Sequence, residues 1–165
     1  MTSLDCGKLE IIKADKDILR SIEFDCGDDD LNEFLLEDSF ANIDNSLSKI
    51  YLCLYDGIVV GFFALSADSI EVNEKLEIKY PEYPAIKIGR LAVHKDYQGI
   101  HIGSTLIDWI VGFCLELRKD IGIRFISVDA YKKVKKFYTD NLFEELQKEE
   151  DNGRNIPMYK DLCQK

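Results

Sequence analysis

A glycine-containing loop joins an apolar run to a helical pattern in AIKIGRLAVHKDYQGIHIGS, residues 85–104. The apolar residues that end at Val93 predict a strand, and the spacing of later apolar residues predicts a helix over 102–117. The first N–H groups of a helix lack intrahelical partners, and the helix dipole favours negative charge at that end. The loop is therefore predicted to bind a phosphate or pyrophosphate.

Other residues that could do chemistry are few. His94 and Glu71 each follow a predicted strand and are candidate general bases, although isolated polar residues beside loops usually have no chemical role. Cys114 could carry an acyl group, but it lies in an apolar helical stretch without a nearby histidine, which predicts a buried inert thiol. The five cysteines and two histidines show no metal-type spacing, so free thiols and no metal are expected.

The elements that must position these residues predict an α/β fold. Strands are expected at 8–13, 49–55, 58–66, 86–93, 123–128, 142–147 and 156–162. Helices are expected after Asp15 or Asp17, after Asp28, and at 102–117 and 131–140, with a loop at 71–84. Asp56-Gly57 tolerates positive φ and predicts a hairpin turn. Antiparallel strands thus come first, followed by a strand-helix-strand unit.

Composition bounds the class of protein. The 165 residues fit a single domain over 1–165, with 46% hydrophobic and 32% charged residues, as in soluble globular chains. No apolar run would span a membrane and no secretory pattern is seen, so a cytoplasmic location is expected. The net charge of −10 argues against a wholly nucleic-acid-binding surface. Residues 86–140 nevertheless carry 10 Lys and Arg against 6 Asp and Glu, so the loop lies in a basic region.

Three groups of motifs point to a known family. The loop QGIHIG, residues 98–103, follows GRLAV, and the downstream segment DAYKKVKKFYTDNLF contains a Phe-Tyr pair. These resemble the GNAT superfamily of N-acetyltransferases, with His101, Val134 and Leu142 where Gly, Ala and Gly are more usual. FDCGDDDLNEFL, GIVVGFFALS and GRLAVHKDYQG further resemble one branch, which includes toxins of toxin-antitoxin modules that acetylate charged tRNA. The resemblance implies a mixed, mostly antiparallel central sheet flanked by helices.

The same resemblance implies acetyl-CoA as co-substrate, with its pantetheine along the strand and its pyrophosphate on backbone N–H groups of the loop. The implied coenzyme-binding residues are Leu91, Ala92, Val93, Gln98, Gly99, Ile100, His101, Ile102, Gly103, Ser104 and Phe137. The lysines at 132, 133, 135 and 136 either contact the 3′-phosphate or form a solvated helix face. His101 would disturb the loop only if its position needed positive φ, which is uncommon outside glycine.

Acetyl transfer to an amine needs a neutral amine, a polarised carbonyl and a way to stabilise the departing thiolate. A backbone N–H near Val93 is expected to polarise the carbonyl. Tyr138 is expected to be the general acid, because a phenol of pKa about 10 can protonate a thiolate whose conjugate acid has a pKa of about 8.5. Outside this resemblance, Tyr138 would be interpreted as a core aromatic.

The predicted function is transfer of an acetyl group from acetyl-CoA to a primary amine, by direct attack in a ternary complex. Two alternatives stay open: toxin-type acetylation of aminoacyl-tRNA, and a non-catalytic acyl-CoA-binding module. Besides acetyl-CoA and the amine, the expected partners include a second copy of the chain, charged tRNA or an antitoxin. No membrane is expected among them.

Overall fold

The computed structural model describes residues 4–72, 76–77, 79–146 and 155–163. The chain forms two compact units, each with its own packing. The first unit contains Met1–Ser66 and Gly89–Leu106, and the second contains Ala67–Ile88 and Ile107–Lys165.

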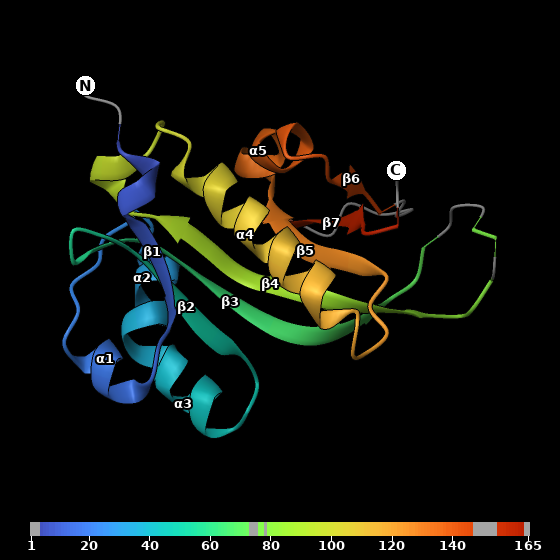
Figure 1. Ribbon diagram of the computed structural model, residues 1–165, viewed down its shortest axis with the longest axis horizontal. Coiled ribbons are helices and arrows are strands. Elements are labelled where there is room, and N and C mark those ends of the chain that lie inside the picture. The colour runs from blue at the N-terminus through green and yellow to red at the C-terminus, as the bar shows by residue number, and fades with distance from the viewer. Residues whose placement is uncertain (1–3, 73–75, 78, 147–154, 164–165) are drawn as a thin grey trace. The chain divides into compact units, whose positions relative to one another are not determined.

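Seven strands form one sheet in the order β1-β2-β3-β4-β5-β7-β6. They are β1 (Leu9–Lys13), β2 (Lys49–Tyr55), β3 (Ile58–Ile70), β4 (Tyr83–Val93), β5 (Phe125–Tyr131), β6 (Glu144–Glu145) and β7 (Asn155–Asp161). The β1–β2, β2–β3, β5–β7 and β6–β7 pairs are antiparallel, whereas β4 and β5 are parallel. The predicted mixed, mostly antiparallel sheet is confirmed (Figure 1).

Helices make up a further part of the described chain. They are α1 (Lys16–Arg20), α2 (Asp29–Glu33), α3 (Ser39–Asp44), α4 (Ile102–Leu117) and α5 (Lys135–Asp140), with short helical turns η1 (Cys6–Lys8), η3 (Lys95–Tyr97) and η4 (Lys132–Val134). The Asp15 carboxylate accepts from Ile18 N at the start of α1, and the Asp28 carboxylate caps α2 in the same way. The predicted caps and the helix over 102–117 are therefore confirmed.

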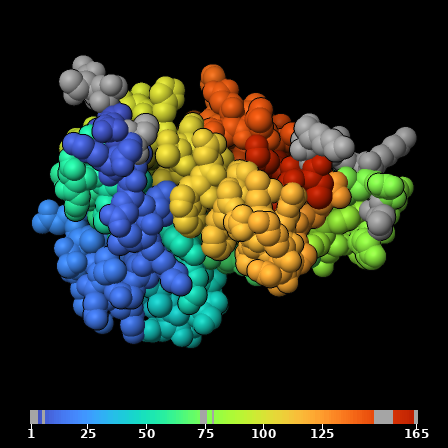
Figure 2. Space-filling view, in the orientation of Figure 1, coloured from blue at the N-terminus to red at the C-terminus, as the bar shows by residue number. Residues whose placement is uncertain are grey.

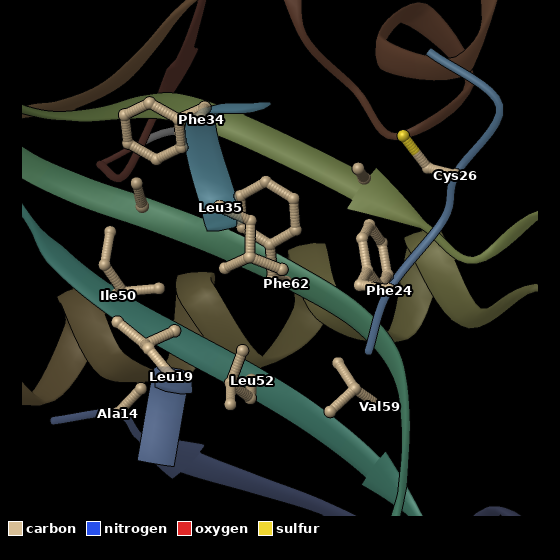
Figure 3. Packing of buried hydrophobic residues seen from close by; sticks show 12 residues of the cluster. Ala14, Leu19, Phe24, Cys26, Phe34, Leu35, Ile50, Leu52, Val59 and Phe62 are labelled. Atoms are coloured by element: carbon tan, nitrogen blue, oxygen red, sulfur yellow. The ribbon is translucent and has the colours of Figure 1, made fainter. Parts of the chain in front are cut away.

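The first unit is built around an apolar core between α1–α3 and the strands β2 and β3. Leu19 and Leu35 from the helical side pack against Ile50 and Leu52 of β2 and Phe62 of β3 (Figure 3). All five side chains are almost completely buried, and the Phe62 ring also contacts the rings of Phe24 and Phe34. The hairpin turn at Asp56-Gly57 has positive φ at both residues, as predicted.

The helical stretch after Asp28 differs from the single helix expected there. A π-helical turn, η2 (Phe34–Asp38), lies between α2 and α3. The buried Ser39 hydroxyl donates to Leu35 O at 2.6 Å and replaces a partner that this wider turn removes. The Phe34 ring, which begins the π-turn, lies under the Arg90 guanidinium at 4.9 Å.

In the second unit, β5 pairs with β4 from Ala85↔Phe125 to Ile88↔Val128, and with β7 along its whole length. The Arg124 guanidinium binds Asp161 with two hydrogen bonds of 2.8 and 2.9 Å at the end of this pair. Helix α4 is visible at the surface in Figure 2, in yellow to orange.

Several boundaries in the second unit differ from the sequence prediction. Strand β3 continues to Ile70, and β4 begins at Tyr83, within the loop expected over 71–84. The expected strand over 123–128 begins at Phe125 and continues to Tyr131, so the helix expected over 131–140 begins later, as η4 and then α5. The first strand of the closing hairpin, expected over 142–147, is reduced to Glu144–Glu145. Its expected turn, 151–154, lies outside the described residues.

Candidate active site

The predicted coenzyme loop lies in the first unit between the end of β4 and the start of α4. The first hydrogen bond of the helix runs from Thr105 N to His101 O, so the N–H groups of Ile102, Gly103 and Ser104 precede the helical ladder. These are the donors that a helix N-terminus offers to an anion. Gly99 and His101 are exposed in the loop that leads to them.

His101 has a φ of +69°, in the left-handed region. Gly99 in the same loop has a φ of +80°. The usual glycine therefore suits position 101 for a steric reason, and histidine keeps the backbone path at a cost of about 1–2 kcal/mol. Leu142 also stands where glycine is more usual and also has a left-handed φ, of +69°. Its side chain is 73% exposed.

We expect His101→Gly to raise the free energy of unfolding by about 0.5–1 kcal/mol, because the relieved strain exceeds the entropy that glycine adds to the unfolded chain. Acetyl-CoA affinity should be equal or better. Urea unfolding and calorimetric titration measure the two effects. Leu142→Gly is the matched control, since it relieves the same strain outside the loop. A large loss of affinity in His101→Gly alone would mean that the imidazole itself holds phosphate.

The side chain of Gln98 holds the loop rather than extending from it. Its amide nitrogen donates to Val93 O and to Cys26 O, both at 2.9 Å. Ala92 is buried in the core of the first unit, whereas Leu91, Val93 and Ile100 are half-buried. The register with β5 ends at Ile88, five residues before the end of β4.

Tyr138 lies in α5 of the second unit and is 5% exposed. Its ring makes edge-to-face contacts with Phe137 at 5.0 Å and Phe143 at 5.3 Å. Its hydroxyl bonds no residue that the structure describes, and none of their buried side-chain oxygens or nitrogens lacks a partner. The hydroxyl is therefore at least partly exposed. Burial raises the pKa of the Tyr138 phenol well above its ordinary value, which keeps the proton in place.

The other candidate residues are placed less favourably for catalysis. His94 Nδ1 already accepts from Asp96 N at 3.1 Å, so a neutral His94 carries its proton on Nε2 and has no second acceptor nitrogen. Glu71 is exposed just after β3. Cys114 is fully buried and unpaired, so the predicted buried thiol is confirmed. Burial raises the pKa of this thiol to about 12, which favours the unreactive protonated form.

Lysines near α5 form ion pairs and a cation–π contact with other side chains. Lys135 pairs with Glu145 at 3.2 Å and Lys136 with Asp140 at 2.7 Å. The ammonium of Lys133 lies over the Tyr131 ring at 5.6 Å. A contact between these lysines and the coenzyme 3′-phosphate stays a prediction.

Across the residues described, no group of three or more His, Cys, Asp or Glu side chains could hold a metal ion. Nor does the described part contain a helix long and apolar enough to cross a membrane.

A family model described as an acetyltransferase (GNAT) domain matches residues 46–145, more than half of the chain. The chain belongs to the GNAT acetyltransferase family. The expected enzyme class, an N-acetyltransferase that uses acetyl-CoA as co-substrate, is thereby confirmed.

Proteins similar to this GNAT chain include a tRNA-acetylating toxin and two proteins of known structure. A tRNA-acetylating toxin of Mycobacterium tuberculosis (strain ATCC 25618 / H37Rv) is 32% identical over 126 residues, which are 73% of this chain and 76% of the toxin. A tyrosine-to-phenylalanine mutant of KacT is 26% identical, with a TM-score of 0.82 over 94% of this chain and 95% of the other. AtaT complexed with acetyl-methionyl-tRNAfMet is 24% identical, with a TM-score of 0.80 over 93% and 94%. At 24% identity, the similarity to AtaT shows that the two proteins share a fold and shows no more than that.

Sequence reasoning missed two features of this GNAT site. Arg90 is exposed on β4, with no carboxylate partner among the residues described, and stacks on the Phe34 ring. The segment 25–27 bonds Gln98 and Lys95. The motif FDCGDDDLN, which carries part of the family resemblance, contains segment 25–27 and was the sequence signal for its role.

Proposed function

We propose that this GNAT enzyme acetylates the amino group of an aminoacyl-tRNA. The observation that carries the proposal is the 32% identity with a tRNA-acetylating toxin over 73% of the chain. The basic region around the coenzyme loop supports it, because phosphate backbones are bound through Lys and Arg. Single domain organisation, a cytoplasmic location, a homodimer and an antitoxin partner stay predictions.

In the proposed reaction, the α-amine nitrogen attacks the thioester carbonyl carbon, the C–S bond breaks, and the thiolate of coenzyme A takes a proton from Tyr138. The nitrogen loses a proton to solvent as the amide forms, and Tyr138 regains a proton from solvent before the next turnover. Backbone N–H groups of Gln98–Ser104 bind the pyrophosphate, Leu91–Val93 bind the pantetheine, and Phe137 lines the coenzyme site. An α-amine with a pKa of about 7.7 is partly neutral near pH 7.5, so it needs no strong base. An aminoacyl acceptor thus fits a site in which His94 has no free acceptor nitrogen.

An acceptor panel tests the proposal. Thiol release from acetyl-CoA is followed with charged tRNAs, uncharged tRNA, peptides and small amines. Turnover with charged tRNA, and none with uncharged tRNA, is the expected result. Preference for a small amine would favour the second candidate function, which the net charge of −10 supports. Tight acetyl-CoA binding with no turnover on any acceptor would identify a non-catalytic acyl-CoA-binding module.

We expect Arg90 to contact a tRNA phosphate, because its guanidinium is exposed and has no carboxylate partner in the described part of the chain. Arg90→Met should make the negative slope of log affinity against log salt shallower by about one, and should raise the KM for tRNA by about fivefold. The control is Lys119→Met, since Lys119 is paired with Glu116 at 3.0 Å. Equal salt slopes in wild type and Arg90→Met would remove Arg90 from the tRNA interface.

A further inference from the structure

A three-residue segment before α2, Asp25–Gly27, is bonded to both ends of the turn that leads into the coenzyme loop. Lys95 N donates to Asp25 O at 2.9 Å, and the Lys95 ammonium binds the Asp25 carboxylate at 2.9 Å. Gln98 donates to Cys26 O and Val93 O. We name Asp25–Gly27 the clamp segment, because it fixes the side chain with which the loop begins.

Asn32 of α2 closes the clamp segment from the helical side. Its amide nitrogen donates to the Asp25 carboxylate at 3.0 Å, and its amide oxygen accepts from Cys26 N at 2.9 Å. The Asp25 carboxylate also accepts from Gly27 N at 2.9 Å. The Asn32 amide thus forms hydrogen bonds with both the Asp25 carboxylate and the Cys26 N–H. Gly27, in the same turn, has a φ of +87°.

The charge of Asp25 is stabilised by these contacts. The hydrogen bond from Lys95, followed by those from Gly27 N and Asn32, holds the pKa of the Asp25 carboxyl well below its ordinary range. The carboxylate is therefore ionised at any pH at which the enzyme would be assayed. Cys26 is buried in the core of the first unit, so the clamp segment is also anchored by packing.

We propose that Asp25 and Asn32 are positioning residues for acetyl-CoA: through Cys26 and Gln98 they hold the coenzyme loop in its binding conformation before the coenzyme arrives. The loop contains two left-handed residues, Gly99 and His101, and such a path is costly to hold without fixed ends. Helix α4 fixes one end, and the Gln98 amide fixes the other. A ready-formed loop loses less conformational freedom on binding, which raises affinity. This inference rests on the proposed coenzyme role of residues 98–104.

The test compares wild type with Asn32→Ala, which removes both amide contacts. Acetyl-CoA binding, measured by titration calorimetry, should weaken about tenfold. The KM for acetyl-CoA should rise by the same factor while kcat changes less than about twofold, because Asn32 does not touch the reacting atoms. Hydrogen exchange of the amides of residues 98–101 should be faster in the variant without any coenzyme present. Asn32→Asp keeps the acceptor for Cys26 N but places a second carboxylate about 3.0 Å from that of Asp25, so it should weaken binding at least as much as Asn32→Ala.

Asp15→Ala is the matched control. It removes a helix cap in the same unit, where the carboxylate accepts from Ile18 N at 2.8 Å, and none of its contacts reaches the loop. Acetyl-CoA affinity in this control should stay within about twofold of wild type at a similar loss of Tm. Equal weakening in the control, or unchanged exchange and affinity in both Asn32 variants, would overturn the inference. Absence of acetyl-CoA binding by wild type would instead overturn the proposed function, and the exchange data would still decide whether Asn32 orders the loop.

Discussion

Tyr138→Phe is expected to lower kcat by about 100-fold while the acetyl-CoA dissociation constant changes by less than about twofold. The variant keeps the ring and its contacts with Phe137 and Phe143, and loses only the hydroxyl. Without that proton donor, the thiolate of coenzyme A must leave unprotonated. Steady-state kinetics at saturating acetyl-CoA and calorimetric titration measure the two quantities separately.

Tyr159→Phe provides the control for this experiment. Tyr159 is also buried in the second unit, but its hydroxyl donates to Glu144 at 3.0 Å. Its removal should cost about 1 kcal/mol of stability and leave kcat unchanged. Unchanged turnover in Tyr138→Phe would remove Tyr138 from the chemical step.

The pH dependence of turnover gives an independent check on Tyr138. Burial raises the pKa of this phenol, so its acid form persists above the pH at which an exposed tyrosine ionises. Activity should therefore rise as the acceptor amine loses its proton and should not fall again at about pH 10, where an exposed tyrosine ionises. A fall in kcat at about pH 10 or below that disappears in Tyr138→Phe would contradict the raised pKa.

Gly61→Ala is expected to lower the free energy of unfolding by about 1–3 kcal/mol. An added Cβ would lie 3.1 Å from Ala92 O and 3.2 Å from Leu106 Cδ1. The leucine side chain can rotate away, but the carbonyl belongs to the backbone of β4 and moves only with the strand. Because Ala92 is a proposed coenzyme-binding residue, acetyl-CoA affinity should fall as well. Urea unfolding and titration calorimetry measure the two effects.

Gly112→Ala is the opposite case within α4. A Cβ at position 112 would meet nothing within 4 Å. Alanine is the better helix former, so this variant should gain about 0.5–1 kcal/mol. A Gly61→Ala protein as stable as wild type would show that β4 yields easily at Ala92.

Features fixed by neighbouring residues were predictable from the sequence. The Asp56-Gly57 turn, the Asp28 cap and the long α4 each depend on a few adjacent side chains, and all were confirmed. The site residues were named largely through a family resemblance, which a single sequence can carry when its motifs are intact. Their roles stay predictions.

Features fixed by distant residues were missed. The π-turn depends on burial of Phe34 and Leu35 against β2 and β3. Tyr131 was expected in a helix, but it pairs with Asn155 and so extends β5. The bond between Gln98 and Cys26 joins residues 72 positions apart, and no local pattern announces it.

That long-range bond sets a lower limit on the length of a working fragment. The region matched to the GNAT family begins at residue 46, well after the clamp segment and α2. A fragment limited to that match would contain every residue of the QGIHIG loop. It would lack the Cys26 carbonyl that accepts a hydrogen bond from the Gln98 amide. We therefore expect a fragment that spans only the family-matched stretch to bind acetyl-CoA more weakly than the full chain, and shortened versions of the enzyme should begin before Phe24.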